Sequence, residues 1–171
     1  MAKVTFEFNR TKAIEAILYL SRRISNPDVY GICKLLYLTD KTSLEKYGRF
    51  IFGESYFALP EGATPSNAYD LLKEATKTSI SGLKVMDNQV IALRESQLDQ
   101  LSKSDLECLD KIINIYGDKP NWYRAKDTHD AAYNKSWEKR GGKQSIIIPV
   151  ESIAELFANS DDLIDYLLNV G

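Results

Sequence analysis

Residues 26–48 constrain the fold most, because their pattern predicts one long helix with a defined start and a defined end. Asn26 can cap a helix, Pro27 suits the first helical position, and Asp28 complements the positive end of the helix dipole. Gly48 suits the left-handed residue that ends a helix. The apolar residues in between cover more than one stripe, which predicts a central helix. They include Ile32, Cys33, Leu35, Leu36, Tyr37, Leu38 and Leu44.

Capping residues followed by apolar residues at a spacing of three or four predict further helices along the chain. These helices are expected from Asn9 or Thr11 to about Ile24, from Thr64-Pro65 onward, from Ser102 to Gly117, from Pro120, over about 130–138, through Ile153, and from Ser160. Residues 83–93 predict a hairpin, because Asp87 and Asn88 tolerate the positive φ of a tight turn. Val4, Phe6 and Phe8 alternate with polar residues, which indicates a short strand or an extended arm.

Residues 146–148 predict a short buried strand or an extended piece, and residues 49–65, rich in aromatics, predict a structured loop. The sum is an α+β fold that is predominantly α-helical: a compact helical domain with a small β-hairpin or sheet. The length of 171 residues fits a single domain spanning 1–171. The formal net charge of −2 creates no global positive field, which argues against a nucleic-acid partner.

The residue types that most enzymes need are scarce in this chain. His129 is the only histidine, and no G-x-S-x-G, P-loop or G-x-G-x-x-G motif accompanies it. We therefore expect no catalytic, cofactor or metal site, and no enzymatic activity. Cys33 and Cys108 lie in helical patterns, which predicts buried free thiols and a reducing compartment. No apolar run approaches the roughly 20 residues of a membrane span, so we expect a cytoplasmic protein.

A basic stretch near residue 140 is the strongest feature in favour of nucleic-acid binding. It comprises Lys135, Lys139, Arg140 and Lys143, close to Tyr133 and Trp137. Basic and aromatic residues together can grip phosphates and bases. The favoured alternative is a solvated turn after a helix, because a surface that follows a phosphate backbone usually carries more positive charges.

Four short motifs follow one another in residues 34–65. They are K-L-L-Y-x-x-D from Lys34, L-x-x-Y-G-R from Leu44, G-x-x-Y-x-A from Gly53 and G-x-x-P from Gly62. In this order and spacing they resemble the Panacea domain family, which includes SocA-like antitoxins and the phage-associated GepA-like proteins. The resemblance covers about residues 10–137 and leaves 138–171 as a C-terminal extension that we expect to pack on the core. The structural motif residues are Lys34, Leu35, Leu36, Tyr37, Asp40, Tyr47, Gly48, Gly53, Gly62 and Pro65.

The resemblance implies an antitoxin of a toxin–antitoxin system. Such a protein neutralises its cognate protein toxin by direct binding, in a heteromeric complex. Two alternatives stay open at this point. The chain could be a proteolytic adaptor that delivers a toxin to a bacterial protease, or a DNA-binding autorepressor of its own operon.

Two segments are candidates for the toxin-binding surface. A binding surface needs a few aromatic or arginine anchors ringed by polar groups. Residues 49–61 supply Arg49, Phe50, Phe52, Tyr56, Phe57 and Glu61. Tyr56 fits a core or an interface equally well, and Arg49 is expected to pair with Asp40 or Glu45.

The second candidate is the acidic end of the chain, which has no Lys or Arg after residue 149. Asp161, Asp162 and Asp165 offer either a solvated helix face or an acidic surface for a basic partner.

Overall fold

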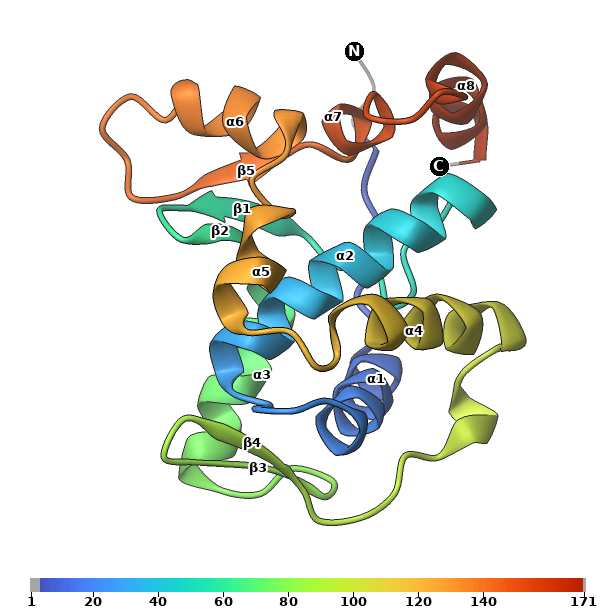
Figure 1. Ribbon diagram of the computed structural model, residues 1–171. Coiled ribbons are helices and arrows are strands. Elements are labelled where there is room, and N and C mark those ends of the chain that lie inside the picture. Colours follow the sequence, from blue (N-terminus) through green and yellow to red (C-terminus); the bar gives the residue numbers. More distant parts are fainter. Residues whose placement is uncertain (1–3, 171) are drawn as a thin grey trace.

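The chain folds into eight α-helices and two small antiparallel sheets over residues 4–170, which the computed structural model describes (Figure 1). The helices are α1 (Arg10–Arg23), α2 (Val29–Tyr47), α3 (Ser66–Lys77), α4 (Lys103–Tyr116), α5 (Asn121–Lys126), α6 (Ala131–Glu138), α7 (Val150–Ala154) and α8 (Ser160–Val170). A short 3-10 turn, η1 (Leu98–Gln100), precedes α4. The predicted fold class, predominantly helical α+β with a small sheet, is confirmed.

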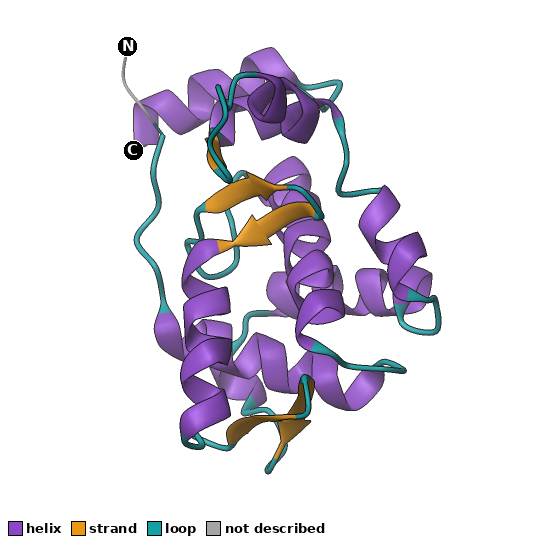
Figure 2. Cartoon of the chain, turned by 90° about the vertical axis from the view of Figure 1, so that its left-hand side faces the viewer, coloured by secondary structure: helices purple, strands orange, loops and turns teal. Residues whose placement is uncertain are grey.

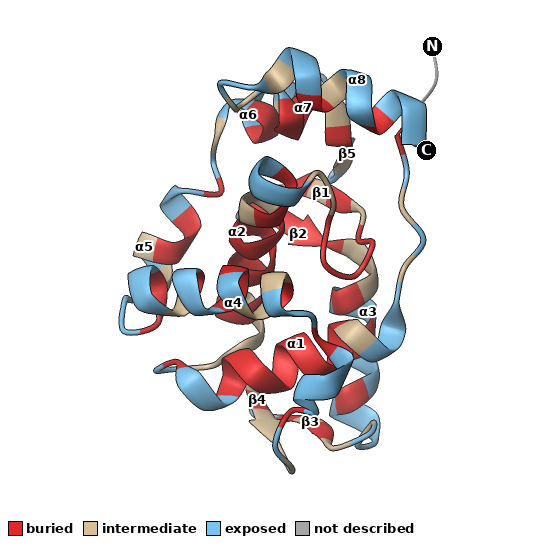
Figure 3. Cartoon of the chain, turned by 90° about the vertical axis from the view of Figure 1, so that its right-hand side faces the viewer, coloured by how far each residue is buried: buried red, intermediate tan, exposed pale blue. Residues whose placement is uncertain are grey.

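Helix α2 crosses the middle of the molecule and is buried along most of its length (Figures 1 and 3). Gly48 ends it in the left-handed conformation, as predicted, with φ of 69°. The predicted start is wrong by two residues. The carboxylate of Asp28 accepts a hydrogen bond from the Gly31 N–H at 2.7 Å and is the N-cap, so Pro27 precedes the cap. Asn26, the predicted cap, instead takes a positive φ of 46° before the helix.

The predicted hairpin is confirmed as β3 (Leu83–Met86) and β4 (Gln89–Ala92). Its turn residues Asp87 and Asn88 have φ of 51° and 64°, the left-handed values that a primed turn requires. Figure 2 shows α3 running from the other small sheet of the molecule to this hairpin. Helix α3 therefore connects the two sheets and packs against strand β3.

The second sheet corrects the expectation of a loop over residues 49–65. This segment contains β1 (Tyr56–Leu59) and β2 (Gly62–Pro65), and the strand order is β2-β1-β5. The third strand, β5 (Ile146–Ile148), was predicted as a short strand or an extended piece, and it pairs antiparallel with β1. Tyr56 lies opposite Ile148, so the sheet joins segments about 90 residues apart in the sequence.

Two hydrophobic clusters form the core, and α2 contributes to both. The first cluster combines α2 with α1, α3, α4 and the β3–β4 hairpin. The second combines the end of α2 with β1, α6, α7 and α8, where Ile153, Leu163 and Leu167 are buried. Because α2 is apolar on more than one side, it can pack against both clusters at once.

Residues 4–9, the described part of the chain before α1, form an extended arm without strand pairing. The Val4 N–H donates to the Glu151 carboxylate at 2.7 Å, and the Phe6 ring packs 5.1 Å from the Phe50 ring. Gly53 allows this close approach, because a Cβ there would lie 1.8 Å from the Glu7 carbonyl oxygen. The arm therefore covers part of the segment that had been predicted to face a partner.

Candidate functional site

Three of the aromatic side chains predicted to contact a toxin lie inside the fold. Phe50, Phe52 and Tyr56 are only 5%, 1% and 1% exposed. The Phe50 and Tyr56 rings pack edge to face with centroids 5.5 Å apart. For Phe50 and Phe52 the expectation of a contact surface is wrong, because Phe6 and Phe8 of the N-terminal arm pack against them. Of the two positions that the sequence left open for Tyr56, core or interface, the structure shows the core. The aromatic area of all three side chains stabilises the core instead.

Arg49 also has a different role from the expected one. It pairs with Asp105 of α4 at 2.8 Å, and not with Asp40 or Glu45. Asp105 is fully buried and also accepts from Lys12 of α1 at 2.6 Å. Burial raises the pKa of Asp105, but the hydrogen bonds from Lys12, the Ser102 N–H and Arg49 outweigh it and hold the pKa below the usual value. Arg49 therefore ties the end of α2 to the start of α4.

Asp40 is equally buried but meets no positive charge. One carboxylate oxygen accepts from the Ile51 N–H and the other from the Tyr56 hydroxyl, each at 2.7 Å. Burial raises the pKa of Asp40 to about 7. The Tyr56 oxygen also lies 3.1 Å from the Leu36 carbonyl, and its single proton can serve only one of the two acceptors. If Asp40 carried a proton, it could donate to the Tyr56 oxygen, and the Tyr56 hydroxyl could then donate to the Leu36 carbonyl.

The remaining motif residues also build the fold. All of them are buried except Tyr47 and Gly48 at the end of α2. The Tyr37 hydroxyl donates to Asp130 at 2.7 Å, and Lys41 pairs with the same carboxylate at 2.8 Å. Asp130 is the N-cap of α6, so this contact fixes α6 to α2. The motif therefore marks a scaffold of internal hydrogen bonds.

The other predicted contact residues reach solvent but lie in two separate places. Phe57 is half-buried and Glu61 is exposed, both on the β1–β2 hairpin. The acids of α8, Asp161, Asp162 and Asp165, are exposed at another end of the molecule (Figure 1). The structure does not bring these two groups together, and their part in toxin binding stays a prediction.

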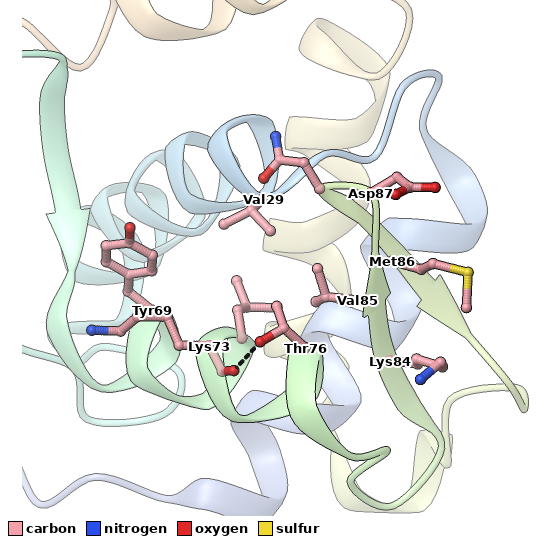
Figure 4. Close-up of a pocket in the computed structure, with 10 residues that line it drawn as sticks. Val29, Tyr69, Lys73, Thr76, Lys84, Val85, Met86 and Asp87 are labelled. Carbon is pink, nitrogen blue, oxygen red and sulfur yellow. Dashed lines mark hydrogen bonds between the residues drawn. The ribbon is translucent and has the colours of Figure 1, made fainter.

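A groove lies between α3, the β3–β4 hairpin and the start of α2 (Figure 4). We call it the Tyr69 groove; its volume is about 440 Å³. Its floor includes the buried side chains of Leu72 and Val85, and Lys84 and Asp87 lie on its rim. Tyr69 on α3 is 37% exposed. An apolar floor with a polar rim is the usual make-up of a protein-binding site.

Sequence reasoning did not identify this groove, although one signal was present. The apolar residues of α3 predicted its inward face, and Tyr69, Lys73 and Thr76 fall on another face at i, i+4 and i+7. Figure 4 shows these three side chains along one edge of the groove. The opposite edge comes from the hairpin, and only the folded chain brings the two edges together.

Two smaller hollows adjoin the Tyr69 groove and share Tyr69 with it. One has a volume of about 200 Å³ and extends to Phe57 of β1. The other, about 170 Å³, is lined by Tyr30, Lys34 and Glu61, and we call it the Lys34 pocket. The groove therefore reaches the predicted contact residues Phe57 and Glu61.

Trp122 on α5 forms a second exposed aromatic surface that the sequence did not indicate. It is 70% exposed, more than any other large hydrophobic side chain in residues 4–170. Its ring lies 5.8 Å from that of Tyr123, which also lies 4.3 Å from the Lys126 ammonium. The helical pattern alone cannot predict such exposure, because α5 has only six residues.

The features that had suggested other chemistry take part in local contacts. His129 Nδ1 lies 3.0 Å from the Ala125 carbonyl oxygen. In the basic stretch, Lys135 pairs with Glu155 at 3.3 Å, and the Arg140 guanidinium stacks 4.0 Å from the Trp137 ring.

Cys33 and Cys108 are free and buried, as predicted. Within the described residues, no group of three or more His, Cys, Asp or Glu side chains is placed to hold a metal ion. No helix of residues 4–170 has the length and apolar character needed to cross a membrane.

The geometry defines a mainly helical α+β domain. The polar side chains of its motif bond inside the fold, and the Tyr69 groove lies along α3. The family model described as antitoxin SocA-like, Panacea domain, matches residues 32–138. This match spans more than half of the chain, and the chain belongs to that family. A search of curated proteins and a search of solved structures each find no match. The expected single domain, with a family-like core over 10–137, stays a prediction.

Proposed function

We propose that this chain is an antitoxin that neutralises a cognate protein toxin by direct binding. The observation that carries the proposal is membership of the SocA-like antitoxin family over residues 32–138. The partner is a protein, and the product of the interaction is a heteromeric complex. Both proteins act in the cytoplasm, which suits the two free buried cysteines.

The Tyr69 groove is the proposed contact surface. It combines a half-exposed tyrosine with a buried apolar floor, and tyrosine is among the residue types enriched at binding hot spots. A stable complex buries about 800 Å² on each partner, which is more than a single hollow offers. The contact therefore extends over the adjoining hollow to Phe57 and over the exposed Met86 of the hairpin.

In this proposal the chain acts by binding and makes or breaks no bond. Two buried carboxylates, Asp40 of the motif and Asp105 of α4, support this, because they are engaged with the chain's own backbone and side chains. Asp40 is held by Ile51 and Tyr56, and Asp105 by Arg49 and Lys12. These contacts stabilise the scaffold that presents the groove.

The test uses the product of a neighbouring reading frame that is lethal when expressed alone. Purified chain and purified toxin are mixed in the absence of any protease, and complex formation and toxin activity are measured. We expect a stable complex and loss of toxin activity at a stoichiometric amount of antitoxin. Toxin that stays active in an excess of folded antitoxin would refute direct neutralisation.

The same materials separate the two alternatives. Rescue of growth that requires an intracellular protease, without inhibition in the purified mixture, would indicate a proteolytic adaptor. Sequence-specific binding to the operator, with an affinity that falls steeply with salt, would indicate an autorepressor.

A further inference from the structure

Lys34 is a buried cation, 2% exposed, that forms no ion pair in the described part of the chain. Burial lowers the pKa of its ammonium, and the charge of Glu61, on the same pocket, acts in the opposite direction. The buried carboxylates Glu15 and Asp105, in contrast, are paired with Arg94 and Arg49. Burying a charge is costly unless a partner compensates for it. Because Glu61 acts on Lys34 only at a distance, without an ion pair, an anion that reached the ammonium from the hollow would be stabilised.

The hydrogen bonds of Lys34 are also incomplete. Its ammonium donates to the Ala63 carbonyl at 3.0 Å and to the Thr64 hydroxyl at a long 3.5 Å. A lysine ammonium has three N–H groups, so at least one has no hydrogen-bond acceptor within the described residues, and the Tyr30 ring lies 4.9 Å from the ammonium. Arg124, which is just as buried, shows the opposite case, because each of its five N–H groups has an acceptor.

The Lys34 pocket has room for a small anionic group. Its volume of about 170 Å³ exceeds that of a carboxylate, and it opens beside Tyr30, Tyr69 and Asn88. Gly62 borders the ammonium: a Cβ at this position would lie 3.3 Å from Lys34 Nζ and 2.5 Å from the Thr128 hydroxyl. The glycine of the G-x-x-P motif therefore lets the Lys34 ammonium and the Thr128 hydroxyl lie close to the backbone.

We propose that the Lys34 pocket binds one carboxylate of the toxin, from an Asp or Glu side chain in an extended segment. This inference rests on the proposed antitoxin function and names the chemistry of its contact. One ammonium matches the single charge of a carboxylate. A phosphate carries more negative charge, and Glu61 at the rim of the pocket would repel it more strongly. The Tyr69 groove continues from the pocket and receives the residues that flank the acid.

The first test needs neither a variant nor the toxin. The ammonium signals of ¹⁵N-labelled chain are followed by NMR during titration with sodium acetate and, separately, with inorganic phosphate. We expect acetate to shift the Lys34 signal in a saturable way while the signal of Lys77, an exposed lysine of α3 outside the groove, stays in place. No response of Lys34 to acetate would overturn the site, and a response to phosphate alone would overturn the choice of a carboxylate.

The second test uses the toxin with a matched pair of variants. Lys34→Met should weaken toxin binding at least tenfold, because the toxin's carboxylate loses its only buried partner. Lys77→Met, an exposed position of α3 outside the groove, should change the affinity less than threefold. Circular dichroism confirms that each variant is folded. Equal binding by Lys34→Met and the wild type would overturn the inference and leave the antitoxin function intact. Absence of any binding by the wild type would instead refute the proposed function, whatever acetate does at Lys34.

Discussion

The motif segment, residues 34–65, and the groove face, formed by α3 and the β3–β4 hairpin, use their polar residues in opposite ways. In the motif segment, Asp40 and Tyr56 are almost completely buried and bond to each other. On the groove face, Lys84 and Asp87 border a hollow, and Tyr69 remains partly exposed. The motif identifies the family, but its side chains mostly point away from solvent.

This difference separates what makes the fold from what can meet a partner. Changes in the motif segment are expected to alter stability, and through stability the amount of folded protein. Changes on the groove face are expected to leave stability almost unchanged and to alter binding. The predictions below test this division, beginning with the largest effect.

Asp105→Ala should destabilise the fold by about 2 to 4 kcal/mol, because it removes the buried carboxylate that the half-buried side chains of Arg49 and Lys12 share. It also removes half of the capping box of α4. Urea unfolding measures the loss. Asp70→Ala is the control, since its ion pair with Lys73 is exposed and its removal should cause no measurable change. A loss below about 1 kcal/mol for Asp105→Ala would contradict the internal role of Arg49.

Asp40 should make the fold more stable at pH 5 than at pH 8. Its pKa is raised to about 7 in the folded state against an ordinary value of 3.8, so the folded chain holds a proton that the unfolded chain has released. Between these pH values the folded form loses that proton, and the contribution of about 2 to 3 kcal/mol disappears as pH rises.

The comparison of wild type with Asp40→Asn isolates this effect. Other carboxylates titrate in both proteins, so the difference between their stability–pH curves reports Asp40. We expect the stability of the wild type to fall more steeply between pH 5 and pH 8 than the stability of the variant, and the difference is the contribution of Asp40. Parallel curves would show that Asp40 is already ionised at pH 5.

Tyr69→Ala should weaken toxin binding about tenfold, or ~1.4 kcal/mol, because it removes the exposed aromatic anchor of the groove. Its urea midpoint should stay close to that of the wild type. Tyr69→Phe keeps the ring and should bind within threefold of the wild type. Calorimetric titration of each variant with toxin gives both values, and unchanged affinity in Tyr69→Ala would remove the groove as the contact surface.

Trp122→Ser should have the smallest effect, with stability and toxin affinity both close to those of the wild type. The side chain is 70% exposed, so its removal creates no cavity. This variant also decides between the two exposed aromatic surfaces. If Trp122→Ser weakens toxin binding more than Tyr69→Ala does, the contact surface lies on α5.

Local signals in the sequence were sufficient for much of the secondary structure. Gly48, Ser102 and the Asp87–Asn88 turn act where they were expected, because caps and tight turns depend on residues close by in the chain. The contact surface could not be predicted in the same way. Whether an aromatic residue is covered depends on segments that are distant in the sequence, such as the N-terminal arm that packs on Phe50.

The sequence by itself determined the helical class of this protein, its central helix and, through four spaced motifs, its family. Only the tertiary structure decided that Arg49 meets Asp105 and that β1 pairs with β5. It also decided that Tyr69 and Lys34 border adjoining hollows. The physical reason is range: helix caps and periodicity act over a few residues, whereas burial and charge pairing depend on which distant segments the packing brings together.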